Sequence, residues 1–206
     1  MDVWGEVADA RVRLAEEIQD LDPDALDTQS WCAGWRVRDV LGHLVYLAEA
    51  TQWVVVRDVV RLGPKPDRAL DRRARLLGSR PPDELVSRLR ASADGRFHVF
   101  GSPAVVALGE VLVHGADMLQ PIGHDIAVDP AVVTPLLGIY RRLHRVAFHG
   151  KRLIVTLVAT DSDTRLGNGP EVHGRSIDLL LLLAGRQQVV PNLRGPGVGL
   201  LPTSSR

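Results

Sequence analysis

Hydrophobic residues recur every three or four positions along most of the chain, which is the pattern of amphipathic helices. The first such stretch ends at Asp22-Pro23, and its apolar positions are Val3, Val7, Ala10, Leu14, Ile18 and Leu21. A second stretch runs from about Val37 to Arg61, and Pro81-Pro82 precedes a third. The pattern therefore predicts helices that bury one face against one another.

Two further helix starts are marked by a polar residue followed by proline. Ser102-Pro103 predicts an N-cap and a first helical residue, and the helix that follows should end near Pro121. Asp129-Pro130 repeats this signal, and its helix should end near Gly150.

The character of the sequence changes at Lys151. Leu153–Val158 is short and β-branched, which predicts a strand, and Gly195–Leu201 could form another. Between them, Ser176–Ala184 predicts a leucine-rich helix that Gly185 closes. We therefore expect a mainly α protein. Residues 1–150 would form an antiparallel helical bundle, and residues 151–206 a small C-terminal α+β region packed on it.

Composition narrows the classes of function. The 206 residues carry no net charge at pH 7, so we expect no nucleic-acid partner, which would require a basic excess. The longest leucine run, Leu179–Leu183, is too short to span a bilayer, and the N-terminus does not look like a signal peptide. Cys32 is the only cysteine, so a disulfide within the chain is excluded. A cytoplasmic protein without a membrane partner is the simplest interpretation.

Three side chains on two predicted helices have the composition of a metal site. Glu110 and His114 are four residues apart and so share one helix face. The neighbours of Glu110 are apolar, and a buried carboxylate is costly unless a cation compensates it. His43 lies among apolar residues of the other helix. If these helices pack side by side, the three residues could bind a divalent metal and leave one coordination position open.

Each of these residues also has a simpler interpretation. His43 could be a hydrogen-bonded core histidine, and Glu110 with His114 could stabilise an exposed helix. Asp117, three residues after His114, is a candidate catalytic residue that would orient His114 or handle a proton; it could equally be an exposed capping carboxylate. Cys32 has no base nearby in sequence, so we interpret it as structural rather than as a nucleophile.

The same motifs resemble the two signatures of the mycothiol-dependent maleylpyruvate isomerase family, within the DinB-like four-helix bundle superfamily. The first signature is Trp31-Cys32-Ala33-Gly34-Trp35, followed by Asp39-Val40-Leu41-Gly42-His43-Leu44. The second is Glu110-Val111-Leu112-Val113-His114-Gly115-Ala116-Asp117. The resemblance implies a DinB-like antiparallel four-helix bundle in which His43, Glu110 and His114 bind a divalent metal, usually zinc.

The sequence departs from the family pattern at a few places. Ala33 stands where proline is usual, and Gly42 where alanine is usual. The region from Lys151 onward looks short beside the second domain of the isomerase itself.

The resemblance implies a metal-dependent enzyme that activates mycothiol for transfer to, or isomerisation of, a small electrophilic substrate. Zinc is the expected metal, and nickel is the alternative. The expected partners are a small-molecule thiol and an electrophilic substrate. A homodimer is possible. Two other functions stay open: a non-catalytic DinB-like protein that binds a metal or ligand, and a hydrolase in which water replaces the thiol. A thiol is favoured over water because the chain offers no convincing nucleophile of its own.

Overall fold

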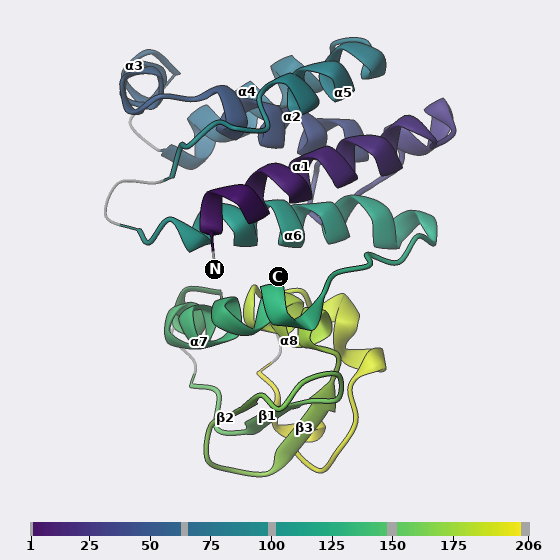
Figure 1. Ribbon diagram of the computed structural model, residues 1–206, viewed down its shortest axis with the longest axis vertical. Coiled ribbons are helices and arrows are strands. Elements are labelled where there is room, and N and C mark those ends of the chain that lie inside the picture. The colour runs from purple at the N-terminus through teal and green to yellow at the C-terminus, as the bar shows by residue number, and fades with distance from the viewer. Residues whose placement is uncertain (1, 63–65, 99–101, 148–151, 203–206) are drawn as a thin grey trace. The chain divides into compact units, whose positions relative to one another are not determined.

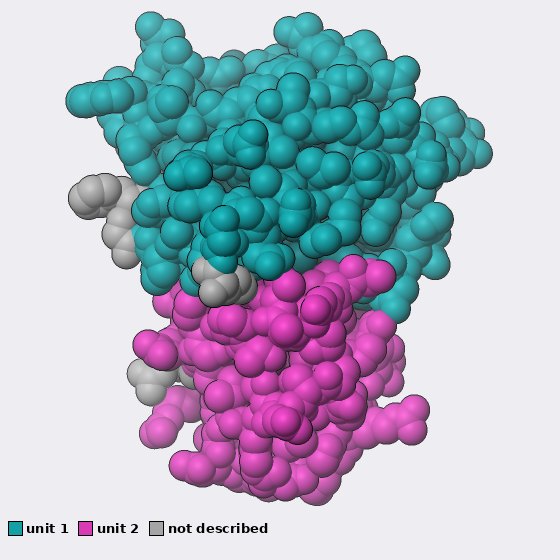
Figure 2. Space-filling model, in the orientation of Figure 1, with its two compact units in different colours: residues 1–126 teal, residues 127–206 magenta. Residues whose placement is uncertain are grey.

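The computed structural model describes residues 2–62, 66–98, 102–147 and 152–202. The chain divides into two units, Met1–Ile126 and Ala127–Arg206, which Figure 2 shows in different colours. The first unit holds helices α1 to α6, and the second holds α7, α8 and a small sheet (Figure 1).

Four helices of the first unit form a bundle. They are α1 (Val3–Gln19), α2 (Val37–Glu49), α5 (Pro82–Ala91) and α6 (Val105–Leu119). α1 packs against both α5 and α6, and α2 packs against the same two helices, so the four enclose one core. The expected mainly α fold with a four-helix bundle is therefore confirmed.

The core of this bundle is made by the apolar positions whose helical spacing is visible in the sequence. Its buried side chains include Val7, Leu14, Ile18, Val40, Leu41, Leu44, Leu85, Leu89, Leu108, Val111 and Leu112. Full burial of one such side chain contributes about 1.5–3 kcal/mol. Packing of these faces, rather than helix propensity alone, therefore holds the bundle together.

The helix predicted over residues 37–61 is interrupted in the structure, which corrects the sequence expectation. α2 ends at Glu49, Ala50 is extended, and α3 (Gln52–Leu62) begins anew. The side chain of Thr51 accepts a hydrogen bond from the Val54 amide at 3.3 Å, which is the contact of a helix N-cap. Thr51 thus starts a new helix rather than extending the apolar face of the first.

A further helix, α4 (Pro66–Gly78), lies directly on α2. A Cβ atom added to Gly42 would lie 2.6 Å from both the Ala74 carbonyl oxygen and the Gly78 amide nitrogen. The two backbones can approach this closely only because residue 42 has no side chain. The glycine at residue 42 is therefore part of how α4 packs on α2.

α6 begins slightly later than the Ser102-Pro103 signal predicts. Its first residue is Val105, and a short 3₁₀ helix, Gln120–Ile122, extends it. By length and composition alone, Val105–Ile122 could cross a membrane, but 67% of this segment is buried within the protein. A buried core helix of a bundle has the same composition, so the segment gives little support to a membrane span.

The second unit combines two helices with a three-stranded sheet. α7 (Pro130–Ala147) packs on α8 (Ser176–Leu183), whose own leucines are buried. The central strand β1 (Thr156–Ala159) pairs antiparallel with β2 (Arg165–Leu166) and parallel with β3 (Glu171–Gly174). Leu157 faces Leu166 on one side and Val172 on the other, which fixes the register. Two 3₁₀ helices, Gln187–Asn192 and Val198–Leu200, follow α8.

Two details of this unit differ from the sequence expectation. The two compact units divide after residue 126 rather than after residue 150, and α7 packs on α8. The strand expected at Gly195–Leu201 is instead one bridge, between His173 and Arg194, followed by a 3₁₀ helix. Gly195 has a φ of +109°, which ends the extended conformation there.

Candidate metal centre

The side chains of His43, Glu110 and His114 converge in the first unit. Nε2 of His114 lies 3.4 Å from Oε2 of Glu110, and Nε2 of His43 lies 3.8 Å from the same oxygen. One potential ligand atom from each residue lies within 4.8 Å of the other two. α2 supplies His43, and α6 supplies the other two from one face. The structure therefore brings together the three residues that the sequence singled out.

The other ring nitrogen of His114 is held by Asp117. Nδ1 of His114 lies 2.9 Å from Oδ2 of Asp117, one helical turn further along α6. Asp117 is fully buried, so it is not the exposed capping carboxylate that the sequence also allowed. A carboxylate at Nδ1 fixes the ring and leaves Nε2 to face Glu110, which is the usual arrangement behind a metal-binding histidine.

Cys32 adds a contact that the sequence did not reveal. Its thiol donates to Oδ2 of Asp117 at 3.0 Å, and its sulfur lies 3.6 Å from Nδ1 of His114. The neighbouring Trp31 amide donates to the Asp117 carbonyl oxygen at 3.0 Å. No base lies near Cys32 in the sequence, but the loop before α2 folds onto the end of α6 and brings Asp117 and His114 to the thiol. Nothing in the local sequence signals a contact between segments so far apart.

Glu110 is less buried than its apolar neighbours suggested. Its side chain is 37% exposed, because it faces a cavity rather than the packed core. This partial exposure lowers the cost of an uncompensated carboxylate, so burial alone does not require a cation beside Glu110. A carboxylate open to a cavity is, on the other hand, accessible to a ligand.

The three groups also perturb one another electrostatically. Burial lowers the pKa of His43, and Glu110 only partly opposes this effect. Burial by itself would raise the pKa of Glu110, but the nearby imidazoles of His114 and His43 outweigh it and lower that pKa. For His114, Asp117, Cys32 and Glu110 together overcome burial and hold the pKa well above its ordinary value. These opposing shifts within one cluster are typical of a functional site.

A cavity of about 150 Å³ opens beside the cluster. His43 and Glu110 form part of its wall, and the other lining residues are Arg11, Leu44, Leu47, Leu70, Phe97, His98, Val106, Ala107 and Val111. A largely apolar pocket with a few convergent polar groups is the usual form of a small-molecule site.

The donor set fits a divalent metal. Two imidazole nitrogens and one carboxylate oxygen suit zinc and similar ions and leave a coordination position for another ligand. Nδ1 of His43 is buried without a hydrogen-bond partner among the described residues. The ring is instead held by packing, with centroids 5.3 Å from Trp35 and 4.9 Å from His114. The nitrogen that faces Glu110 is Nε2, and at 3.8 Å it lies beyond hydrogen-bond distance of that carboxylate, so Nε2 is available to a metal.

A second triple, Cys32, His114 and Asp117, also meets the distance criterion for a metal. Its atoms already bond to one another, because Oδ2 of Asp117 accepts from the Cys32 thiol and pairs with Nδ1 of His114. The triple of His43, Glu110 and His114 fits a metal better, because it opens onto the cavity.

Comparison with known proteins gives a match to a family domain and a shared fold. Residues 7–100 match the model of the mycothiol maleylpyruvate isomerase N-terminal domain. The match includes His43 but stops before Glu110. No curated protein matches the sequence well enough to indicate homology.

Two crystal structures of the mycothiol-dependent maleylpyruvate isomerase resemble the whole chain. The wild-type enzyme aligns with a TM-score of 0.64, and a histidine-to-alanine variant aligns with 0.66, each at 15% identity. Each alignment covers 95% of this chain and 92% of the isomerase chain. The expectation that the C-terminal region is much shorter than the second domain of the isomerase was therefore wrong. The domain match therefore covers residues 7–100, and the likeness to the two isomerase structures shows a shared fold over nearly the whole chain.

Proposed function

We propose that this protein is a metal-dependent enzyme that activates a low-molecular-weight thiol, mycothiol. The activated thiol is either transferred to a small electrophilic substrate or used to isomerise it. The observation that carries the proposal is the convergence of His43, Glu110 and His114 at the wall of an apolar cavity. The family match and the names of the two structural neighbours supply the thiol and the reaction class.

In this proposal, His43, Glu110 and His114 hold the metal, with zinc favoured and nickel as the alternative. The metal's chemistry would be to lower the pKa of the thiol, which stabilises the reactive thiolate. Asp117 acts as a positioning residue. Its buried carboxylate fixes the His114 ring through Nδ1, so that Nε2 faces Glu110 across 3.4 Å.

The cavity wall supplies the remaining functions. Leu44, Leu47 and Val111 exclude water from the reacting groups and bury the body of the substrate. The Cys32 thiol donates a hydrogen bond to Asp117, so we do not assign Cys32 as the nucleophile. An external thiol therefore remains the nucleophile of choice.

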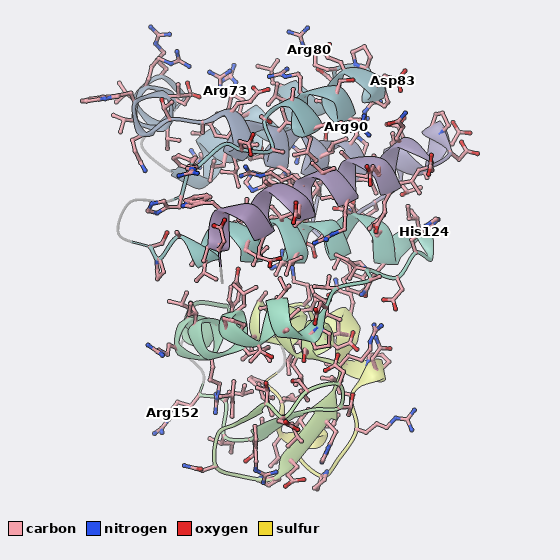
Figure 3. The ribbon with its side chains drawn as sticks, in the orientation of Figure 1. Arg73, Arg80, Asp83, Arg90, His124 and Arg152 are labelled. Carbon is pink, nitrogen blue, oxygen red and sulfur yellow. The ribbon has the colours of Figure 1, made fainter. Side chains whose placement is uncertain are left out.

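The proposal is tested by metal analysis and a turnover assay. Purified protein should contain about one zinc or nickel ion per chain, and turnover of maleylpyruvate or a related electrophile should require mycothiol. His114→Ala and Glu110→Gln should lose both metal and turnover. His124→Ala is the matched control, because His124 is exposed and lies beyond the end of α6 (Figure 3).

The outcomes separate the alternatives. Equal turnover without any thiol would support a metal-dependent hydrolase instead. Metal binding without turnover or thiol binding across a broad substrate screen would support a non-catalytic DinB-like protein. Full metal occupancy in His114→Ala would place the ligands elsewhere.

A further inference from the structure

A buried positive charge lies in the wall of the cavity that holds the candidate metal ligands. Arg11 of α1 is only 3% exposed, yet it lines this cavity. Among the residues that the structure describes, no carboxylate oxygen lies within 4.0 Å of its guanidinium. A buried charge without a counterion is costly, so its retention calls for an explanation.

The hydrogen bonds of Arg11 fix its position but leave donors unused. Nη1 donates to the carbonyl oxygens of Gly95 at 2.7 Å, Ala93 at 2.9 Å and Ser92 at 3.4 Å. Nε and Nη2 make no hydrogen bond to any described residue. The guanidinium is therefore held by one nitrogen, while the edge that usually binds a carboxylate has no protein acceptor.

Arg11 remains charged under ordinary conditions. Burial lowers its pKa to about 10, and no neighbouring acid is among the causes of this shift. At neutral pH the cavity wall therefore carries a full positive charge that the described protein does not neutralise.

The rest of the cavity complements this charge. Leu44, Leu47 and Phe97 are among the apolar residues of its wall, while His43 and Glu110 belong to the candidate metal centre. Glu110 lies beyond ion-pairing distance of Arg11. A matching ligand has one anionic group, a short apolar body, and a size suited to about 150 Å³.

We infer that Arg11 is the anion-binding residue of this cavity and that the cavity takes a small organic carboxylate. The carboxylate pairs with Nε and Nη2 of Arg11, and its short body lies against the apolar wall. Identifying this acid with the electrophile rests on the proposed function, whereas binding of the acid requires only Arg11 and the cavity.

The test compares crotonate with crotonamide, which have the same body but differ in charge. Binding is measured by calorimetry on metal-free His114→Ala protein, so that the carboxylate cannot bind a metal instead. Crotonate should bind about tenfold or more tightly than crotonamide, and Arg11→Gln should remove about the same factor. Arg13→Gln, an exposed arginine on the same helix, should leave binding unchanged.

A second measurement covers the case in which Arg11→Gln unfolds after losing its three carbonyl contacts. In the wild-type protein, the Nε–H NMR signal of Arg11 should shift on titration with crotonate but not with crotonamide, and the Arg13 signal should stay in place. Equal binding of acid and amide, no binding of either, or a stationary Arg11 signal would overturn the inference.

These results can be distinguished from failure of the proposed function. If crotonate binds through Arg11 but no thiol-dependent turnover is found, only the proposed function fails. If turnover is found and Arg11→Gln folds without raising KM for the substrate, only the assignment of Arg11 fails.

Discussion

At the residue scale, the contacts from Cys32 to Asp117 and from Asp117 to His114 fix the orientation of the His114 ring, a candidate metal ligand. Asp117 accepts from the Cys32 thiol at 3.0 Å and pairs with the His114 ring at 2.9 Å. Such outer partners set the tautomer and orientation of a ligating histidine.

We therefore predict that Asp117→Asn weakens zinc binding by about 10–100-fold without abolishing it. The amide keeps the size of the side chain but loses the charge that favours an Nδ1–H proton on His114. Competition with a chelator measures the affinity, and circular dichroism checks the fold. Cys32→Ser should have a smaller effect, since a hydroxyl can still donate to Asp117. Unchanged zinc affinity in Asp117→Asn would remove Asp117 from the site.

The sequence predicted some of these residues because their relation is local. The four-residue spacing of Glu110 and His114 places them on one face of any helix, and Asp117 follows on that face. The contacts of Cys32 and the charge of Arg11 in the cavity were not predictable. They depend on loops and helices that meet only in the folded chain, and periodicity carries no information about which helices become neighbours.

At the element scale, an ionic cluster fastens α3 to its neighbours. Asp58 of α3 is 1% exposed and accepts two hydrogen bonds from Arg73 of α4, both at 2.7 Å. The Tyr46 hydroxyl of α2 donates to the same carboxylate at 3.1 Å. The Arg73 contact is the main reason that the pKa of Asp58 is lowered.

Asp58→Asn should lower the free energy of unfolding by about 3 kcal/mol near neutral pH, because it leaves Arg73 without its buried partner. The folded-state pKa of Asp58 lies below its unfolded value of about 3.9, so the carboxylate stabilises the fold above that pH. The difference between wild type and variant should therefore shrink as pH falls below about 4. Denaturant titrations across pH measure it, with exposed Asp27→Asn as a control costing less than about 1 kcal/mol. A pH-independent difference would contradict the prediction.

The close approach of α2 and α4 gives a second element-scale prediction. Gly42→Ala should destabilise the protein by about 1–3 kcal/mol, even though alanine favours helices, because its Cβ would meet backbone atoms at 2.6 Å. Gly138→Ala in α7 is the matched control. Nothing lies within 4 Å of its added Cβ, so it should stabilise by up to about 1 kcal/mol. Thermal denaturation of both variants gives the comparison, and equal shifts in Tm would exclude the steric explanation.

Helix positions followed from the sequence better than helix boundaries did. The periodic apolar faces of α1, α5 and α6 are strong signals, and proline and glycine mark several ends. The break between α2 and α3 was missed because Thr51 fits both an apolar stripe and an N-cap. The role of Gly42 was likewise hidden, since the sequence does not show which backbone lies against it.

At the scale of the whole molecule, the candidate metal ligands and the cavity all belong to the first unit. A ligand that binds only the folded state stabilises the unit that contains its site. Zinc at 100 times its dissociation constant would add about 2.7 kcal/mol.

Zinc should therefore slow amide hydrogen exchange in the first unit's core helices more than in α7 and α8. Mass spectrometry of peptides from both units, with and without zinc, measures this, and His114→Ala should abolish the effect. Equal protection of both units by zinc would contradict the assignment of the ligands to the first unit alone.

The main-chain and side-chain contacts of Asp117 also fix the position of α6 along its axis and its rotation about that axis. The Trp31 amide bonds to its carbonyl oxygen and the Cys32 thiol to its carboxylate, so the loop before α2 is pinned at two points to the end of α6. Sliding α6 by one residue would move it about 1.5 Å and rotate it about 100°, which breaks both bonds and turns His114 away from His43. The loop thus fixes the position of α6 relative to α2, although the two helices are distant in sequence. Insertions or deletions between residues 28 and 36 should be tolerated far less well than surface loops usually allow.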